Sequence, residues 1–200
     1  MDTSCQEGGL PFKAGVFFEE KGVVGDACWP YSFVLNSKRL PACSEEPSSC
    51  LNQQRYFAKK GSTRNLFGAH QDPAHTISLI KHEIINHGPV VATFRVFNDF
   101  VTWWQRGCPG VYRPNSQSGV DGWHAVVLTG WGIHTDGTPF WEMRNSWGLT
   151  GEKNTGYGKM PLSTHVRPEN HIGLDFPVDG TNGGVTTFLA SKITQTPSPS

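Results

Sequence analysis

The sequence predicts an α+β fold, with helices in the first half of the chain and a mostly antiparallel sheet in the second half. Two segments of the first half carry apolar residues at helical spacing, whereas from Gly110 onward short apolar runs alternate with turn-forming residues. The 23 glycines and 14 prolines among 200 residues require many turns. This composition argues against a helical bundle or a coiled coil.

The first predicted helix covers residues 10–21. Pro11 fits its first turn, and Gly22 can end it. Its buried face is predicted from apolar residues three or four positions apart: Leu10, Ala14, Phe17 and Phe18.

The second helix is predicted to begin at the capping residue Thr76 and to stop at Gly88-Pro89. One face of this helix is expected to carry four isoleucines, Ile77, Ile80, Ile84 and Ile85. Val90 to Phe97 then reads as a strand. Further strands are predicted over 110–113, 122–131, 139–145, 156–160 and 171–176.

Three parts of the chain follow from this layout. Residues 1–88 form a predominantly helical lobe with a long loop region, and residues 89–180 form a β-rich lobe. Residues 181–200 are rich in Gly, Thr, Ser and Pro, so we expect a disordered tail there.

The composition excludes several classes of function. The 17 basic residues balance the 17 acidic ones, which argues against a nucleic acid or an anionic membrane surface as partner. No apolar run reaches the roughly 18 residues that a membrane span needs. The first residues are polar and lack the apolar region of a signal peptide.

The cysteines and histidines do not suggest a metal site. The five cysteines contain no CxxC pair, so a zinc ribbon is excluded and disulfides, with one cysteine left over, are favoured. His82 and His87 are five positions apart, which would turn them about 140° from each other on a helix. We therefore expect a solvated helix face there, no metal and no cofactor.

Two segments of the β-rich half point to catalysis. His124 heads an apolar strand, and Asn145 ends the strand over 139–145. If these strands are antiparallel neighbours, the asparagine carbonyl could accept the imidazole N–H and fix the tautomer, while Trp147 shields the hydrogen bond from water. The alternative is a histidine of the core that is satisfied by its surroundings. The segment around Asn145 favours catalysis and predicts the supporting half of a Cys-His-Asn unit.

These segments resemble the papain family of cysteine peptidases, in particular its cathepsin B branch, across roughly residues 4–178. The segment from Gly122 to Gly132 is similar to the family's histidine strand, and Phe140 to Gly148 is similar to its asparagine strand. Weaker matches support the resemblance: Cys5 to Gly9, Lys21 to Val23, Cys28 to Ser32, Asn86 to Val90 and Gly110 to Tyr112.

The resemblance implies roles for individual residues. His124 corresponds to the general base and acid, Asn145 to its orienter and Trp147 to the shield. Gly8 and Gly9 resemble the turn whose backbone binds an extended peptide, and Trp123 is assigned with them to substrate binding. The resemblance also places Cys28, Cys43 and Cys50 in a disulfide-bonded loop region, with the pairing left open.

The sequence departs from the family pattern at the nucleophile. It contains no Cys-Gly-Ser-Cys-Trp segment, which would lie roughly 130–150 residues before the histidine and asparagine. Cys108 is a poor substitute because no helix follows it to lower its pKa. We therefore expect the C-terminal portion of a peptidase, inactive by itself.

Other departures concern specificity. Ser44-Glu45-Glu46 stands where the cathepsin B branch carries paired histidines, so trimming of dipeptides is not expected. Ile172 stands where the family usually has cysteine.

Two functions stay open: a cysteine-type endopeptidase present as a fragment, and a non-catalytic papain-like binding or scaffold protein. The resemblance implies a peptide or protein substrate, a monomer, and a lysosomal, vacuolar or secreted location.

Overall fold

A computed structural model describes residues 9–29, 50, 54–66, 73–148, 151–162 and 185–187. The chain divides into two compact units, one of Met1–Arg64 with Phe188–Ser200 and the other of Asn65–Thr187. The sequence predicts a boundary near residue 88. The difference arises because the second helix packs on the sheet, through Ile80 in the core and the partly buried Ile77 and Ile84.

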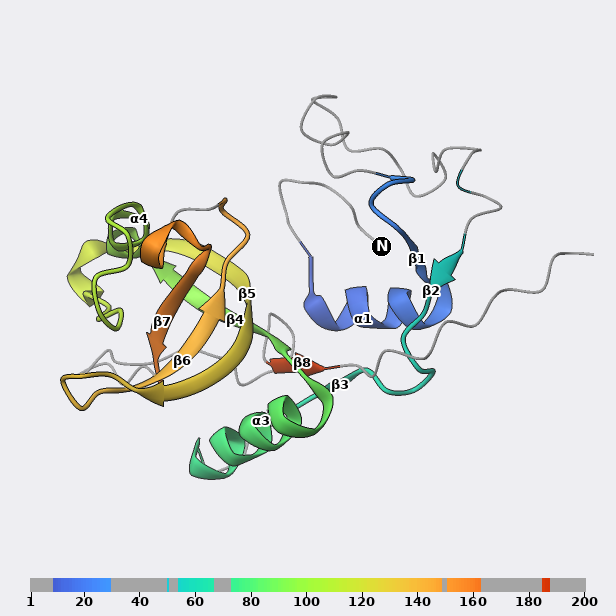
Figure 1. Cartoon of the computed structure of the whole chain (residues 1–200), viewed down its shortest axis with the longest axis horizontal. Helices are drawn as coiled ribbons and strands as arrows, with labels where there is room; N and C mark the ends of the chain where they lie inside the picture. The colour runs from blue at the N-terminus through green and yellow to red at the C-terminus, as the bar shows by residue number, and fades with distance from the viewer. Residues whose placement is uncertain are drawn as a thin grey trace, which may run out of the picture. The chain divides into compact units, whose positions relative to one another are not determined.

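The first unit is built around helix α1 (Pro11–Glu20), beside which β1 (Val23–Val24) pairs antiparallel with β2 (Arg55–Tyr56) (Figure 1). The helix agrees with the prediction over 10–21, and Pro11 opens it. The prediction of its buried face is only partly correct, because Ala14 is exposed and Gly15 is buried. A Cβ atom at Gly15 would lie 2.5 Å from Cγ2 of Thr63, so only glycine allows this close packing.

Two further contacts stabilise the first unit. The Glu19 carboxylate accepts hydrogen bonds from the backbone N–H groups of Gly61 (2.6 Å) and Thr63 (2.5 Å). A disulfide joins Cys28 and Cys50, whose Cα atoms are 5.7 Å apart. This disulfide resolves part of the pairing that the sequence left open, whereas Cys5 and Cys43 lie outside the described residues.

In the described part of the second unit, six strands form a sheet in the order β3-β8-β4-β5-β6-β7. Its strands are β3 (Arg64–Asn65), β4 (Val90–Phe97), β5 (Val120–Ile133), β6 (Pro139–Arg144), β7 (Tyr157–Pro161) and β8 (Val185–Thr187). The pairs β4–β5, β5–β6, β6–β7 and β4–β8 are all antiparallel. The fold is therefore α+β, as predicted.

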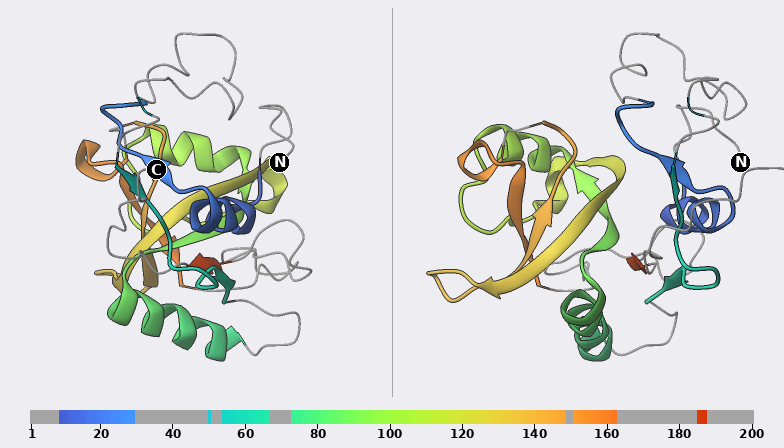
Figure 2. Two further views of the ribbon diagram at one scale, coloured as in Figure 1. Left: turned by 90° about the vertical axis from the view of Figure 1, so that its right-hand side faces the viewer. Right: turned by 45° about the vertical axis from the view of Figure 1, so that its right-hand side comes forward.

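Strand β5 is long and curved, so that its first half pairs with β4 and its second half with β6 (Figure 2). Helix α3 (Pro73–His87) precedes β4 and helix α4 (Asn98–Gln105) follows it. Short 3₁₀ turns occupy Ser116–Ser118 and Glu152–Asn154.

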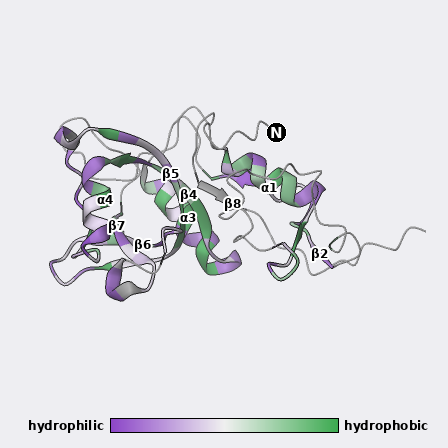
Figure 3. Cartoon of the chain, turned by 90° about the horizontal axis from the view of Figure 1, so that it is seen from above, coloured by the Kyte–Doolittle hydropathy of each residue, from purple (hydrophilic) through white to green (hydrophobic). Residues whose placement is uncertain are grey.

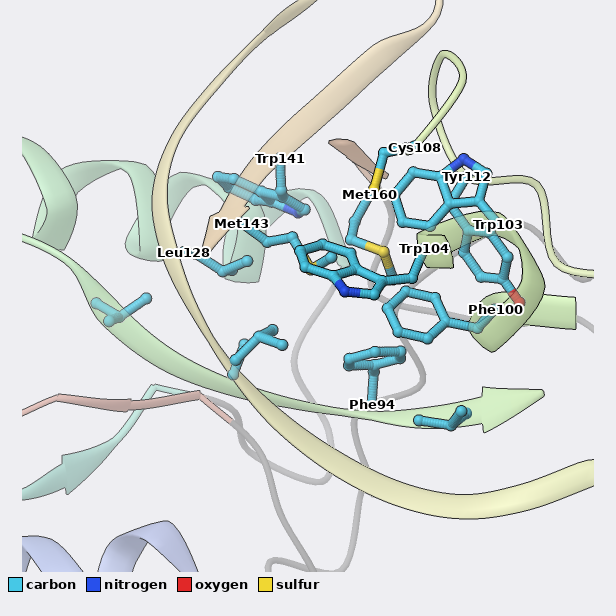
Figure 4. Close-up of a cluster of buried hydrophobic side chains, with 14 of the residues drawn as sticks. Phe94, Phe100, Trp103, Trp104, Cys108, Tyr112, Leu128, Trp141, Met143 and Met160 are labelled. Carbon is cyan, nitrogen blue, oxygen red and sulfur yellow. The ribbon is translucent and has the colours of Figure 1, made fainter. Parts of the chain in front are cut away.

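Among the described residues of the second unit, sixteen buried side chains form one hydrophobic cluster. Figure 4 shows its aromatic and sulfur-containing side chains packed between the sheet and α4. Phe94 of β4 meets Phe100 of α4 edge to face, with 5.0 Å between the ring centroids. Trp141 and Met143 of β6 are fully buried beside them. Burial of these large side chains supplies most of the hydrophobic stabilisation of the sheet.

Several predicted elements need correction. Helix α3 begins at Pro73, not at a cap on Thr76, because proline fits the first helical turn and Thr76 is buried inside the helix. Ile85 is exposed, because it points away from the face that Ile80 buries. Figure 3 shows hydrophobic and hydrophilic residues interspersed along the helices.

Further corrections concern the strands. The strand expected over 110–113 is reduced to a single bridge between Val111 and Lys159, since Gly110 has a positive φ of 66° and Pro114 follows closely. Helix α4 was not predicted. The strand expected over 171–176 lies outside the described residues.

The segment expected as a disordered tail contains a strand at Val185–Thr187, which pairs with Val91 and Ala92 of β4. Its Val-Thr-Thr sequence suits a strand, because β-branched residues favour extended backbone.

No helix among the described residues is long and apolar enough to cross a membrane. Those residues also hold no group of three or more His, Cys, Asp or Glu side chains that could bind a metal ion. Nδ1 of His87 lies 3.1 Å from Oε1 of the buried Glu83, one turn earlier on α3, so this histidine has a partner within its own helix.

Candidate active site

The sheet brings His124 and Asn145 together from two adjacent strands. In the antiparallel register of β5 and β6, Val127 lies opposite Arg144, and Asn145 follows Arg144 directly. The imidazole Nε2 of His124 lies 2.8 Å from Oδ1 of Asn145. This distance is that of a well-formed hydrogen bond.

The orientation of the Asn145 amide follows from its backbone neighbours. Oδ1 also accepts the backbone N–H of Ser146 at 2.7 Å, and the backbone N–H of Asn145 donates to the Gly156 carbonyl at 2.9 Å. Because the Ser146 N–H can bond only to an oxygen, it keeps Oδ1 on the side of His124. Oδ1 is an acceptor, so Nε2 must carry the proton and Nδ1 must hold the lone pair.

The other end of the Asn145 amide is less well satisfied. Asn145 is buried, and its Nδ2 has no hydrogen-bond partner in the structure as described. An unpaired buried donor typically costs about 1–3 kcal/mol.

Aromatic rings enclose the imidazole. The Trp147 ring lies 4.6 Å from the His124 ring with 32° between their planes. Phe94, opposite His124 in the β4–β5 register, meets it edge to face at 5.9 Å. Phe100 supports Trp147 at 5.6 Å. Trp147 thus covers the imidazole on one side and is itself held by the core.

The enclosure changes the electrostatics of the imidazole. Burial lowers the pKa of His124 below its ordinary value of 6.5, and the hydrogen bond to Asn145 opposes this by favouring the protonated ring. Burial is the larger of the two effects. The resting ring is therefore neutral near pH 7, with Nδ1 able to accept a proton.

Trp123 lies on the other face of the strand from His124, since successive side chains of a strand alternate. Its cross-strand partner is Arg95, whose guanidinium carbon lies 5.3 Å from the ring centroid. Trp123 is 44% exposed. Trp123 is predicted from the resemblance to bind substrate, and that role stays a prediction; its neighbour in the structure is Arg95.

The two predicted glycines are only partly described. Gly9 is exposed, and a Cβ atom there would have no neighbour within 4 Å. Gly8 lies outside the described residues.

The described cysteines do not complete the site. Cys28 and Cys50 form a disulfide, and Cys108 is the free cysteine of the described segments. Cys108 is buried, which raises the pKa of its thiol to about 12. A thiol in this state is almost entirely protonated at neutral pH and is a poor nucleophile.

Sequence reasoning missed three supports of the site: the Ser146 N–H, Phe94 and Phe100. The backbone donor leaves no signal in a sequence. Phe94 could have been found by pairing the predicted strand over 90–97 with that over 122–131. Phe100 depends on helix α4, whose eight residues are too few to show a clear helical period.

Taken together, these residues are a neutral imidazole beside an amide oxygen and under an indole ring, an arrangement that could support proton transfer in nucleophilic hydrolysis. The chain belongs to the papain family of cysteine proteases, whose family model matches residues 1–174.

Curated relatives agree with this family. The chain is 34% identical over 181 residues to the gut-specific cysteine proteinase of Caenorhabditis elegans, covering 86% of this chain and 51% of that protein. It is 29% identical over 188 residues to the cathepsin B-like cysteine proteinase 5 of the same organism, covering 84% and 51%. The chain therefore spans about half the length of these relatives.

The fold also resembles a solved structure. The procathepsin B S9 of Trypanosoma congolense superposes with a TM-score of 0.62 at 22% identity, over 93% of this chain and 55% of that chain. This likeness concerns the fold. It agrees with the prediction that the chain has a papain-like fold and corresponds to only a portion of such a protein.

Proposed function

We propose that His124 and Asn145 are the proton-transfer pair of a cysteine-type endopeptidase, with His124 as general base and acid and Asn145 as its orienter. The observation that carries the proposal is the 2.8 Å contact between Nε2 and Oδ1, because it leaves Nδ1 as the proton acceptor. Trp147 over the ring limits competition from water.

The chemistry of such a pair is a balanced proton transfer. Nδ1 of His124 takes the proton of a cysteine thiol, and the thiolate attacks the carbonyl carbon of the scissile peptide bond. The imidazolium then returns the proton to the leaving amine as the C–N bond breaks, which leaves an acyl-enzyme for water to hydrolyse. Asn145 assists because its carbonyl dipole stabilises the imidazolium without becoming charged itself.

The thiol must come from a residue other than the described cysteines. We propose that this chain by itself does not hydrolyse peptides. Among the described cysteines, Cys108 is buried and protonated and Cys28 and Cys50 are bonded to each other, and neither Cys5 nor Cys43 stands in a Cys-Gly-Ser-Cys-Trp segment. The test is to assay the purified chain with fluorogenic peptides and with an epoxide that alkylates active-site thiols. We expect neither turnover nor labelling. Turnover that disappears in His124→Ala would overturn this proposal, and its loss in Cys108→Ser would identify Cys108 as the nucleophile.

A non-catalytic binding or scaffold role is the second candidate, and the burial of Cys108 is the observation that favours it. Transcripts that extend upstream of Met1 separate the two. An in-frame Cys-Gly-Ser-Cys-Trp segment supports the peptidase, whereas a start codon at Met1 without such a segment supports the binding role.

The remaining expectations follow from the same proposal. We propose that the backbone of Gly8 and Gly9 binds extended peptides, and separately that Trp123 contacts substrate. We propose that the protein is a monomer. We also propose a lysosomal, vacuolar or secreted location, and the Cys28–Cys50 disulfide supports this location because such bonds persist in oxidising compartments.

A further inference from the structure

The loop before β5 is held by the first two residues of helix α4. The backbone N–H of Asn98 donates to the Gly119 carbonyl at 3.1 Å, and its side-chain amide donates to the Ser118 carbonyl at 2.6 Å. The next residue, Asp99, accepts three hydrogen bonds. Its donors are the Ser118 hydroxyl (2.7 Å), the Tyr112 hydroxyl (3.1 Å) and the Asn115 backbone N–H (3.0 Å).

All of these partners lie between the bridge residue Val111 and the start of β5 at Val120. The carboxylate therefore closes a loop onto α4 at three points, of which Tyr112 is buried in the core. We call this set of contacts, made by Asn98, Asp99, Tyr112, Asn115 and Ser118, the α4 clamp.

The contacts of the α4 clamp reach Ser118, two residues before β5 begins, and the pairing register of β5 with β4 shifts at that end of the strand. Val96 of β4 pairs with Gly122, but Phe97 pairs with Val120, so the extra residue Asp121 forms a bulge at the start of the strand. A slip of one residue along a strand turns every side chain to the opposite face. Such a slip would exchange Trp123 and His124 and remove the imidazole from Asn145.

The same helix also reaches the site from behind. Phe100, the residue after Asp99, contacts both Phe94 and Trp147, the two rings that flank the imidazole. On the helix, the α4 clamp is made by Asn98 and Asp99, and the ring contacts are made by the next residue of α4, Phe100. The position of α4 is thereby coupled to the start of β5 and to the shield at once.

We infer that Asp99 is a positioning residue for His124, acting through Ser118 and the start of β5. This inference rests on the proposed function of His124, but the contacts that carry it lie entirely outside the histidine–asparagine pair. Loss of the Asp99 carboxylate or of its contacts should let β5 separate from β4 at Gly122–His124 and admit water to the imidazole.

The experiment compares variants of the full chain by NMR. Ser118→Ala and Tyr112→Phe each remove one donor to Asp99 without changing the charge, and Asp99→Asn changes the acceptor itself. We expect amide exchange at residues 122–124 to accelerate on the order of tenfold, the size expected for the loss of one hydrogen bond to a charged group. The His124 pKa should rise toward its ordinary value in Ser118→Ala, because burial is what lowers it.

The control is Glu142→Gln, which alters an exposed carboxylate on β6 that accepts the Thr129 hydroxyl at 2.9 Å. It should change neither quantity. Effects of Ser118→Ala and Asp99→Asn should be non-additive, because both act on one contact.

The outcomes separate the two claims. Unchanged exchange and an unchanged His124 pKa in Ser118→Ala and Tyr112→Phe would overturn the role of Asp99. An imidazole whose Nε2 is unprotonated in the unaltered chain would instead contradict the proposed histidine–asparagine pair. If Asp99→Asn fails to fold, the two milder variants decide.

Discussion

At His124, burial and hydrogen bonding act on the imidazole pKa in opposite directions, so two substitutions should move that pKa in opposite directions. Trp147→Ala exposes the ring and should raise the His124 pKa, since burial is the larger influence. Asn145→Ala removes the acceptor of the Nε2 proton and should lower it. Titration of the His124 ring by NMR measures both.

A matched control for the indole is Trp131→Ala. Trp131 and Trp147 are similarly exposed, at 36% and 39%, but Trp131 packs on Trp141 and Lys81. The Trp131→Ala substitution should leave the His124 pKa unchanged. A fall of the pKa in Trp147→Ala would show that the indole acts on the imidazole in some way other than by excluding water.

The lowered His124 pKa also affects stability. A histidine with a pKa below its unfolded value binds its proton more weakly when folded, so its contribution to stability is complete above about pH 6.5 and is lost as the pH falls from there toward the folded pKa. The pH dependence of unfolding between pH 7.5 and 5.5 should therefore be shallower in Trp147→Ala.

At the scale of elements, strand β7 depends on a glycine. A Cβ atom at Gly158 would lie 2.8 Å from Cη2 of Trp103 and 3.1 Å from Cε of Met143. Both side chains belong to the packed core, so neither can move away without disturbing α4 or β6. We expect Gly158→Ala to destabilise the chain by about 1–3 kcal/mol, the usual cost of overpacking.

Gly130→Ala is the control, because a Cβ atom there meets only the flexible end of Glu142 at 3.7 Å. Denaturant unfolding with tryptophan fluorescence compares the two. Equal stabilities would mean that the core around β7 is packed more loosely than the structure shows.

The long elements could be predicted from the sequence because their patterns are strong. Val90–Phe97 is a strand over the predicted residues, and α3 ends at His87, before the predicted Gly88-Pro89 stop. The proximity of His124 and Asn145 could be predicted for the same reason, although His124 lies within β5 and Asn145 directly follows β6. Helix α4 could not, because tertiary packing of Phe100 and Trp104, more than local periodicity, holds its eight residues.

At the scale of the whole molecule, the division into units could not be predicted. Sequence order places α3 with the helical half, but the burial of Ile80 places it with the sheet. Similarly, β8 lies far along the chain from β4, and nothing local indicates that they pair. Pairing between strands far apart in the sequence depends on the completed fold, whereas the local sequence pattern indicates only which residues favour a helix or a strand.

The two units should differ in their resistance to unfolding. All sixteen residues of the described hydrophobic cluster belong to the unit of residues 65–187. Among the described residues of the other unit, the buried apolar side chains are Cys50 and Ala58. Because each buried large apolar side chain contributes about 1.5–3 kcal/mol, the first unit should open at a lower free energy.

Limited trypsin digestion measures this difference. We expect the first cuts within residues 1–64, with the exposed Lys59 and Lys60 as described targets, and a longer-lived product that contains β4 to β7. Reduction of the Cys28–Cys50 disulfide should speed these cuts without speeding cleavage in the sheet, because that bond lies wholly in the first unit. Initial cleavage at Arg113 or Lys159 would contradict the lower stability of the first unit. Uniform resistance that is lost in a single cooperative transition would show that the two units unfold as one.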